Sequence, residues 1–220
     1  MDEVTRKWFD PSTVKVMRSP ELEGWRTDAE LARLSGAPRD SRLEVTVLDG
    51  GAIQLKAIND RLLEEPLVRL VRQEADGYVF QILNASFVLQ AEFRFLGIGP
   101  RSVAIELLEA KSFGSISKVI VHAVGDRSTW TGSNAMNGYY VWPLIGFNAP
   151  LPERLREHPE LPSCCRGIET MAGLMSTCEG ERFWLEHGES IRLEFSLADG
   201  SESWTRFHHY VGQRNIRVTA

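Results

Sequence analysis

The chain has 220 residues, with 25 basic and 30 acidic side chains and a formal net charge of −5. This acidic balance argues against a nucleic-acid partner, because nucleic-acid binders normally present a basic field. Hydrophobic residues at 43% and charged residues at 25% are typical of globular proteins, and no stretch approaches the roughly 18 uninterrupted apolar residues of a membrane span, so no membrane partner is expected.

The N-terminus and the cysteines together favour the cytoplasm. Residues 1–10 are charged and lack the apolar segment of a secretory signal. The three cysteines include the adjacent pair Cys164 and Cys165, which fits neither a disulfide framework nor the spacing of a zinc site. We therefore expect free thiols in a reducing compartment, a cytoplasmic location and no metal site.

Residues 1–40 are predicted to form an irregular N-terminal arm. Pro11, Pro20 and Pro38 divide this segment into short apolar pieces, and proline interrupts regular hydrogen bonding. One helical turn is expected over residues 27–34, with Asp28 helping to cap it.

Four strands in antiparallel meander order are predicted next. Apolar and polar residues alternate in four runs, which cover residues 43–47, 53–58, 67–72 and 78–83. Hairpin turn signals separate the first run from the second, at Asp49-Gly50-Gly51, and the third from the fourth, at Ala75-Asp76-Gly77. Residues 87–95 are expected to be extended or irregular.

Residues 94–99, Arg-Phe-Leu-Gly-Ile-Gly, carry the functional interpretation. They are predicted to be a strand end and a glycine-bearing turn that leads into a helix over residues 102–113. Such a turn directs backbone N–H groups and the positive end of a helix dipole at one point, which suits an anion. Gly97 and Gly99 would let a phosphate approach the backbone closely. The alternative is a plain strand-to-helix connection.

The second half of the chain is predicted to alternate strands and helices. An apolar run at 118–124 is typical of a buried, parallel strand, and an aromatic-rich helix over 133–145 should be shortened or bent by Pro143. After a proline-rich linker we expect a helix at 179–187, a strand at 191–197 and a last helix at 201–211. The predicted organisation is an arm (1–40), a core (41–150) and a C-terminal α/β extension packed on the core (151–220).

The order of these elements resembles the GNAT superfamily of N-acetyltransferases. Arg94, Gly97 and Gly99 match its Gln/Arg-x-x-Gly-x-Gly/Ala turn, and residues 137–147 look like its later helix, which often closes in Gly-Phe. The resemblance covers residues 43–147. It implies an α+β fold of the acyl-coenzyme A N-acyltransferase type, with a mixed, mostly antiparallel sheet flanked by helices.

What this resemblance implies is an enzyme that transfers an acetyl group from acetyl-coenzyme A to the amine of a small molecule or peptide. The pyrophosphate would lie on the backbone of the turn, and two arginines would add positive charge. A neutral amine would attack the thioester, helped by a base and by an acid that protonates the leaving thiolate. The implied cofactor-binding residues are Arg94, Phe95, Leu96, Gly97, Ile98, Gly99 and Arg101.

Three departures from the family pattern affect the catalytic assignment. Pro100 removes one backbone donor beside the turn, and Trp142 stands where the family has its acidic tyrosine. Tyr139 and Tyr140 are the candidate acids instead, and Glu92 is the candidate base, with an exposed structural glutamate as its alternative. The helix pair that usually joins the first two strands is absent between residues 47 and 53, which leaves the arm as a source of acceptor contacts.

Two other functions stay open at this point. One is a GNAT-like protein without catalysis that binds a ligand or a partner, which Pro100 and Trp142 favour. The other is a structural protein whose extension forms a homodimer. A dinucleotide-binding fingerprint is disfavoured, because Ser102 stands at its third glycine position. His122, within an apolar run, is interpreted as a core histidine.

Overall fold

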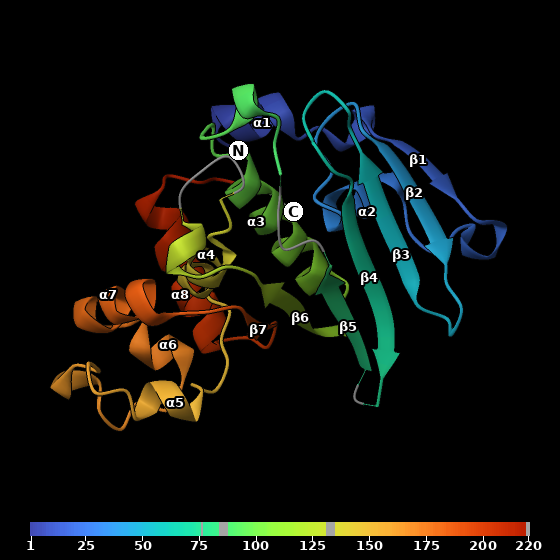
Figure 1. Cartoon of the computed structure of the whole chain (residues 1–220). Helices are drawn as coiled ribbons and strands as arrows, with labels where there is room; N and C mark the ends of the chain where they lie inside the picture. Colours follow the sequence, from blue (N-terminus) through green and yellow to red (C-terminus); the bar gives the residue numbers. More distant parts are fainter. Residues whose placement is uncertain (76, 84–87, 131–134, 219–220) are drawn as a thin grey trace. The chain divides into compact units, whose positions relative to one another are not determined.

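The computed structural model describes residues 1–75, 77–83, 88–130 and 135–218 (Figure 1). The chain is an α+β protein with a seven-stranded mixed sheet, in the order β1-β2-β3-β4-β5-β6-β7, flanked by helices. It divides into two compact units. Unit 1 comprises residues 1–119 and the C-terminal residues from Gln213, and unit 2 comprises Ile120–Gly212. The division therefore falls within β6 (Ile116–Ala123), whereas the sequence placed boundaries at residues 40 and 150.

The predicted antiparallel meander is confirmed in unit 1. Its strands pair in sequence order, with Leu43 opposite Ala57 and Leu55 opposite Arg69. The hairpin at residues 49–51 is closed by the Leu48 N–H, which donates to the Ala52 carbonyl at 2.7 Å, while the predicted turn at 75–77 includes residue 76, outside the described residues. The strands are β2 (Arg42–Val47), β3 (Ile53–Ile58), β4 (Leu67–Glu74) and β5 (Gly77–Ile82).

The first 40 residues are more regular than the predicted arm. They form α1 (Glu3–Trp8), β1 (Lys15–Arg18) and α2 (Asp28–Leu34), with 3-10 turns η1 (Pro11–Thr13) and η2 (Pro20–Leu22). Strand β1 joins the sheet parallel to β2, and α2 lies between these two strands in the sequence. A helical connection therefore exists before β2, whereas the family pattern would place one between β2 and β3. Thr27, not Asp28, caps α2, because Thr27 and Glu30 form a reciprocal capping box; Asp28 instead pairs with Arg18.

Helix α3 (Ile98–Ser112) begins four residues before its predicted start. Pro100 lies in the first turn of the helix, where a missing N–H removes no intrahelical bond. The preceding segment is a 3-10 turn, η3 (Ala91–Phe93), and not the expected strand end. Ala104, Leu107 and Ala110 are fully buried and give α3 its apolar face, so the helix packs closely in the core of unit 1.

One face of the sheet carries an ion pair into this core. The Arg69 guanidinium of β4 donates to both carboxylate oxygens of Glu106 on α3, at 3.1 and 2.8 Å, and each side chain is only 1% exposed. The Ser102 hydroxyl lies 3.3 Å from the same carboxylate. Burial raises the pKa of Glu106, against the opposing influence of Arg69 and Ser102. This bidentate geometry is what makes two buried charges tolerable.

Strand β6 starts beside β5 in unit 1. The Tyr78 N–H donates to the Ser115 carbonyl at 3.1 Å, and the two strands are neighbours in the sheet. Because both strands begin at this contact, they run in the same direction. His122 is exposed, between the buried Val121 and Ala123, so its interpretation as a core histidine is wrong.

Unit 2 is built around a cluster of aromatic side chains. Phe147, Trp184 and Phe195 are fully buried, and the predicted helix at 179–187 and strand at 191–197 are confirmed. The aromatic-rich helix begins at residue 138, and residues 133 and 134 of its predicted span lie outside the described part. As predicted, it closes at Gly146, and Pro143 lies inside it. The elements of unit 2 are η4 (Arg127–Thr129), α4 (Gly138–Ile145), α5 (Glu153–Arg156), η5 (Ser163–Cys165), α6 (Met171–Leu174), α7 (Cys178–His187), β7 (Ile191–Ser196) and α8 (Glu202–Gln213).

Candidate functional site

The turn before α3 combines a left-handed glycine with backbone strain. Gly97 is the N-cap of α3 with φ of 72°, and Phe95 also has a positive φ, 64°. A bulky residue in this region is an outlier that surrounding structure must enforce. The Phe95 side chain is fully exposed and Leu96 is 44% exposed. The turn therefore presents two apolar side chains to solvent beside the N-terminus of a 15-residue helix.

Arg101 fixes the conformation of this turn. Its Nη1 donates to the Gly97 carbonyl at 2.9 Å, and its Nε lies 3.0 and 3.1 Å from the two carboxylate oxygens of Asp2. The positive φ of Gly97 favours glycine at this position, and a Cβ atom there would lie 2.5 Å from Nη1 of Arg101, so the guanidinium would have to shift. Asp2 thus neutralises the charge of Arg101, and the Arg101 side chain is only 10% exposed.

Asp2 is the anchor on the other side of this contact. Its carboxylate accepts from the N–H of Thr5, at 2.8 Å, and so caps α1, and it also accepts from the N–H of Arg217 at 2.8 Å. Burial acts to raise the pKa of Asp2, but the hydrogen bonds from Arg101, Arg217 and Thr5 outweigh it and hold the pKa well below 3.8. One carboxylate therefore ties together α1, α3 and the C-terminal segment.

Two further sequence candidates lie at the edge of the turn. Arg94 donates through Nε to the Leu89 carbonyl at 3.0 Å and pairs with Glu64 at 2.8 Å, with about a third of its side chain exposed. Glu92 lies in η3 and is exposed. This exposure fits the alternative interpretation of Glu92 as a structural surface glutamate. Arg94 is the cation of the turn that solvent reaches more readily than Arg101.

The two candidate tyrosines belong to unit 2, and they are held differently. The Tyr139 hydroxyl donates to the Leu185 carbonyl at 2.8 Å, and burial raises the pKa of this phenol. The Tyr140 hydroxyl instead donates to the Glu181 carboxylate on α7, and the Trp130 ring packs edge-on against it at 5.2 Å. Tyr140 is the better placed of the two to exchange a proton, because its partner is ionisable. Glu181 was missed from the sequence, where nothing links it to a residue 41 positions earlier.

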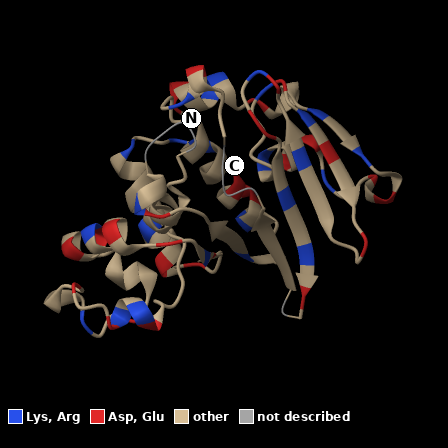
Figure 2. Cartoon of the chain, in the orientation of Figure 1, with Lys and Arg blue, Asp and Glu red and all other residues tan. Residues whose placement is uncertain are grey.

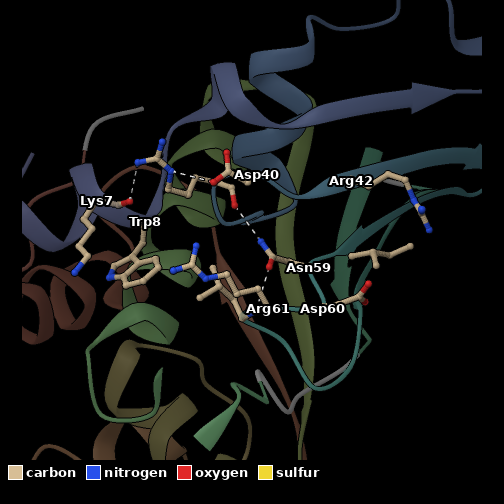
Figure 3. Close-up of a pocket in the computed structure, with 10 residues that line it drawn as sticks. Lys7, Trp8, Asp40, Arg42, Asn59, Asp60 and Arg61 are labelled. Atoms are coloured by element: carbon tan, nitrogen blue, oxygen red, sulfur yellow. Dashed lines mark hydrogen bonds and ion pairs between the residues drawn. The ribbon is translucent and has the colours of Figure 1, made fainter. Parts of the chain in front are cut away.

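Sequence reasoning also missed a charged pocket in unit 1 (Figure 3). Its volume is about 510 Å³, and it lies where β2 begins and β3 ends. Three separate segments contribute to it, so no local motif could have identified it. Across the chain basic and acidic positions are interspersed (Figure 2), but here four bases meet two acids. The pocket is lined by Lys7, Trp8, Arg39, Asp40, Arg42, Ile58, Asn59, Asp60, Arg61 and Leu62.

Hydrogen bonds hold the walls of the charged pocket together. Asn59 donates through Nδ2 to the Arg39 carbonyl at 3.0 Å and accepts from the Leu62 N–H at 3.1 Å. Arg39 donates to the Lys7 carbonyl at 3.3 Å and its Nε lies 3.4 Å from Asp40 (Figure 3). These contacts join the α1 segment to the loop that follows β3, so the pocket is largely preformed.

The charged pocket adjoins the segment that enters the glycine turn. The Trp8 ring packs edge-on against Phe93 of η3, with ring centroids 5.5 Å apart. The Gln90 N–H donates to the Leu62 carbonyl at 3.0 Å. Two pocket residues, Trp8 and Leu62, therefore contact the segment just before the turn.

A scan against models of known protein families found no match, and a search of curated proteins found none either. Among the described residues, no helix combines the length and the apolar character needed to cross a membrane. The same residues contain no group of three or more His, Cys, Asp or Glu side chains arranged to hold a metal ion.

Proposed function

We propose that this chain is an N-acyltransferase of GNAT-like fold, which uses acetyl-coenzyme A to acetylate the amine of a small molecule or peptide. The observation that carries the proposal is the left-handed glycine turn at Gly97, which caps α3 between β5 and β6. The connection from β1 through α2 to β2 adds support. It supplies a helical link between the first two strands, which the sequence pattern lacked.

The chemistry of the turn suits a pyrophosphate. The first N–H groups of a helix have no intrahelical partner, and the helix dipole adds partial positive charge at that end. Gly97 keeps the backbone free of a side chain there, and Arg94 offers an accessible guanidinium. The strained backbone at Phe95 fits a functional turn, because strain of this kind concentrates at binding sites.

The proposed reaction forms one bond and breaks one bond. The neutral amine nitrogen attacks the thioester carbonyl carbon, the C–N bond forms and the C–S bond breaks. The amine proton passes to a base, and the departing thiolate takes a proton from an acid. The residues that the sequence offers for these roles are Glu92 as the base and Tyr140 as the acid. Glu181 would orient the Tyr140 phenol. Tyr139 is the weaker candidate, since its hydroxyl is committed to a backbone carbonyl.

A second function is favoured by two observations. Trp142 occupies the position of the family tyrosine and packs against Phe147 at 4.9 Å, with 6% exposure. Arg101 is neutralised by Asp2, which lowers the positive charge beside the turn. A GNAT-like protein that binds a ligand without catalysis is therefore the alternative, and it predicts coenzyme A binding without turnover of any amine.

The experiment compares two variants of Gly97 by calorimetric titration with coenzyme A and acetyl-coenzyme A. Asn and Asp have the same size and both tolerate the left-handed region, so G97N is the matched control for G97D. The added carboxylate should weaken coenzyme A binding about tenfold relative to G97N through charge repulsion with phosphate. The same carboxylate at a helix N-terminus should raise thermal stability relative to G97N.

These opposite signs separate a ligand effect from a folding effect. Equal affinities of G97D and G97N for coenzyme A would remove the turn as the pyrophosphate site. Absence of binding to the unmodified protein at millimolar coenzyme A would overturn both the enzyme and its non-catalytic alternative. Binding with no acetylation across an amine panel would select the alternative.

A further inference from the structure

We propose that the charged pocket binds a small organic anion, best matched by a phosphate monoester on an apolar body. The pocket is separate from the turn before α3, although two of its lining residues contact the segment that enters the turn. This inference goes beyond the proposed acyltransferase and does not depend on coenzyme A.

The lining of the pocket carries a surplus of positive charge. Four basic side chains line it against the carboxylates of Asp40 and Asp60, so its lining is net positive in a chain whose net charge is −5. A local surplus of positive charge in an acidic protein attracts anions and raises their local concentration. If charges were distributed at random over this acidic chain, an average pocket lining would be net negative.

Two of these cations have no carboxylate partner among the described residues. Arg39 pairs with Asp40, and Arg42 pairs with Glu44. Lys7 and Arg61, in contrast, make no ion pair within the described ranges. A phosphate monoester carries a charge of about −1.5 to −2 at pH 7, which matches two free cations. The planar guanidinium of Arg61 can also donate two parallel hydrogen bonds to it.

Part of the pocket lining is apolar. Ile58, Leu62 and the Trp8 ring supply apolar surface beside the charges. The Lys7 ammonium lies over the Trp8 ring at 5.0 Å, a cation–π contact that holds the charge at the pocket. A volume of about 510 Å³ is within the range of small-molecule sites. The ligand is therefore expected to carry an apolar or aromatic group next to its phosphate.

The test is calorimetry of the whole chain at low salt with four probes: phenyl phosphate, benzoate, inorganic phosphate and benzylamine. We expect sub-millimolar binding of phenyl phosphate, weaker binding of benzoate and inorganic phosphate, and none of benzylamine. R61Q should weaken phenyl phosphate about tenfold, as expected for a charge-assisted hydrogen bond. R6Q is the matched control, because Arg6 is exposed on α1 beside Lys7 and does not line the pocket.

Two outcomes would overturn the proposal. No binding of phenyl phosphate at millimolar concentration removes the site. Equal weakening by R61Q and R6Q shows attraction to the surface as a whole. Displacement of phenyl phosphate by coenzyme A, which carries a phosphate monoester on its ribose, would support the anion site and identify the coenzyme as one of its ligands. If coenzyme A fails to bind while phenyl phosphate binds, only the acyltransferase falls.

Discussion

Unit 1 contains two regions rich in arginine, and they use charge in different ways. Around α3, three arginines each face a carboxylate: Arg69 faces Glu106, Arg33 faces Glu109 and Arg101 faces Asp2. In the charged pocket, four bases face two acids. In the first region Arg69, Arg101 and two of the three carboxylates are buried, whereas the second region is open to solvent.

The difference follows from the solvation of the charges. A buried cation without a partner loses its hydration and destabilises the fold, so a core tolerates only matched charges. An exposed cation keeps its water and needs no partner for folding. Unmatched cations in a pocket are therefore available to a ligand, whereas the matched arginines around α3 hold the helix in place. Arg101 is one of the matched arginines around α3, because it pairs with Asp2. The sequence had instead suggested that Arg101 would face a phosphate.

The largest effect is expected from breaking the most buried pair. E106Q leaves the Arg69 guanidinium buried without its counter-charge, and we expect a loss of about 3–5 kcal/mol in the free energy of unfolding. The double substitution R69M/E106L removes both charges and should recover most of this loss. Urea denaturation followed by circular dichroism measures both. A loss below about 1 kcal/mol for E106Q would show that the pair behaves as a surface pair.

The sequence predicted much of the sheet because its pattern is local. The alternation of Leu43 and Val45 with polar residues, and the Asp49-Gly50-Gly51 turn, suffice to define the first hairpin. Strand β1 was missed because it has four residues with no fully buried position, and only its pairing with β2 makes it a strand. The start of α3 was misplaced because η3 replaces the expected strand end.

The sites were harder to predict because they depend on distant residues. Nothing in the sequence of the predicted helix over 102–113 indicated that Glu106 is buried. Its burial depends on the counter-charge of Arg69, which lies on β4. Arg101 was expected to add positive charge beside the turn, but its partner, Asp2, lies 99 residues away in the sequence. The charged pocket combines the α1 segment with loops on either side of the first hairpin, so its surplus charge exists only in three dimensions.

A smaller effect, with a pH dependence, is expected at Asp2. Asn caps a helix as well as Asp does, so D2N removes the charge beside Arg101 and leaves the cap of α1. We expect a loss of about 1.5 kcal/mol at pH 7, the contribution of a hydrogen bond to a charged group. The pKa of Asp2 is lowered by folding from 3.8, so its carboxylate stabilises the fold above about pH 4 and progressively less below it.

Thermal denaturation at pH 7, 5 and 3 tests this assignment. The difference in stability between the unmodified chain and D2N should be constant from pH 7 to 5 and should narrow at pH 3. A difference that does not change with pH would mean that the Asp2 charge contributes nothing and that Arg101 is available at the turn.

The smallest effect on stability is expected in the charged pocket, at Asp40. This residue has a positive φ of 62°, which Asn tolerates, and its side chain is 64% exposed. D40N should therefore change the free energy of unfolding by less than about 0.5 kcal/mol. It also releases Arg39 and removes a negative charge, so phenyl phosphate should bind about threefold more tightly.

The control for this variant is D49N, which removes an exposed carboxylate from the turn between β2 and β3, outside the pocket. Calorimetry should show tighter binding for D40N alone. Equal tightening in both variants would mean that the ligand senses only the total charge of the chain, and the contrast between the two arginine-rich regions would then have no bearing on binding. A change confined to D40N, with stability unaltered, would instead show that charge in this pocket serves recognition while charge around α3 serves the fold.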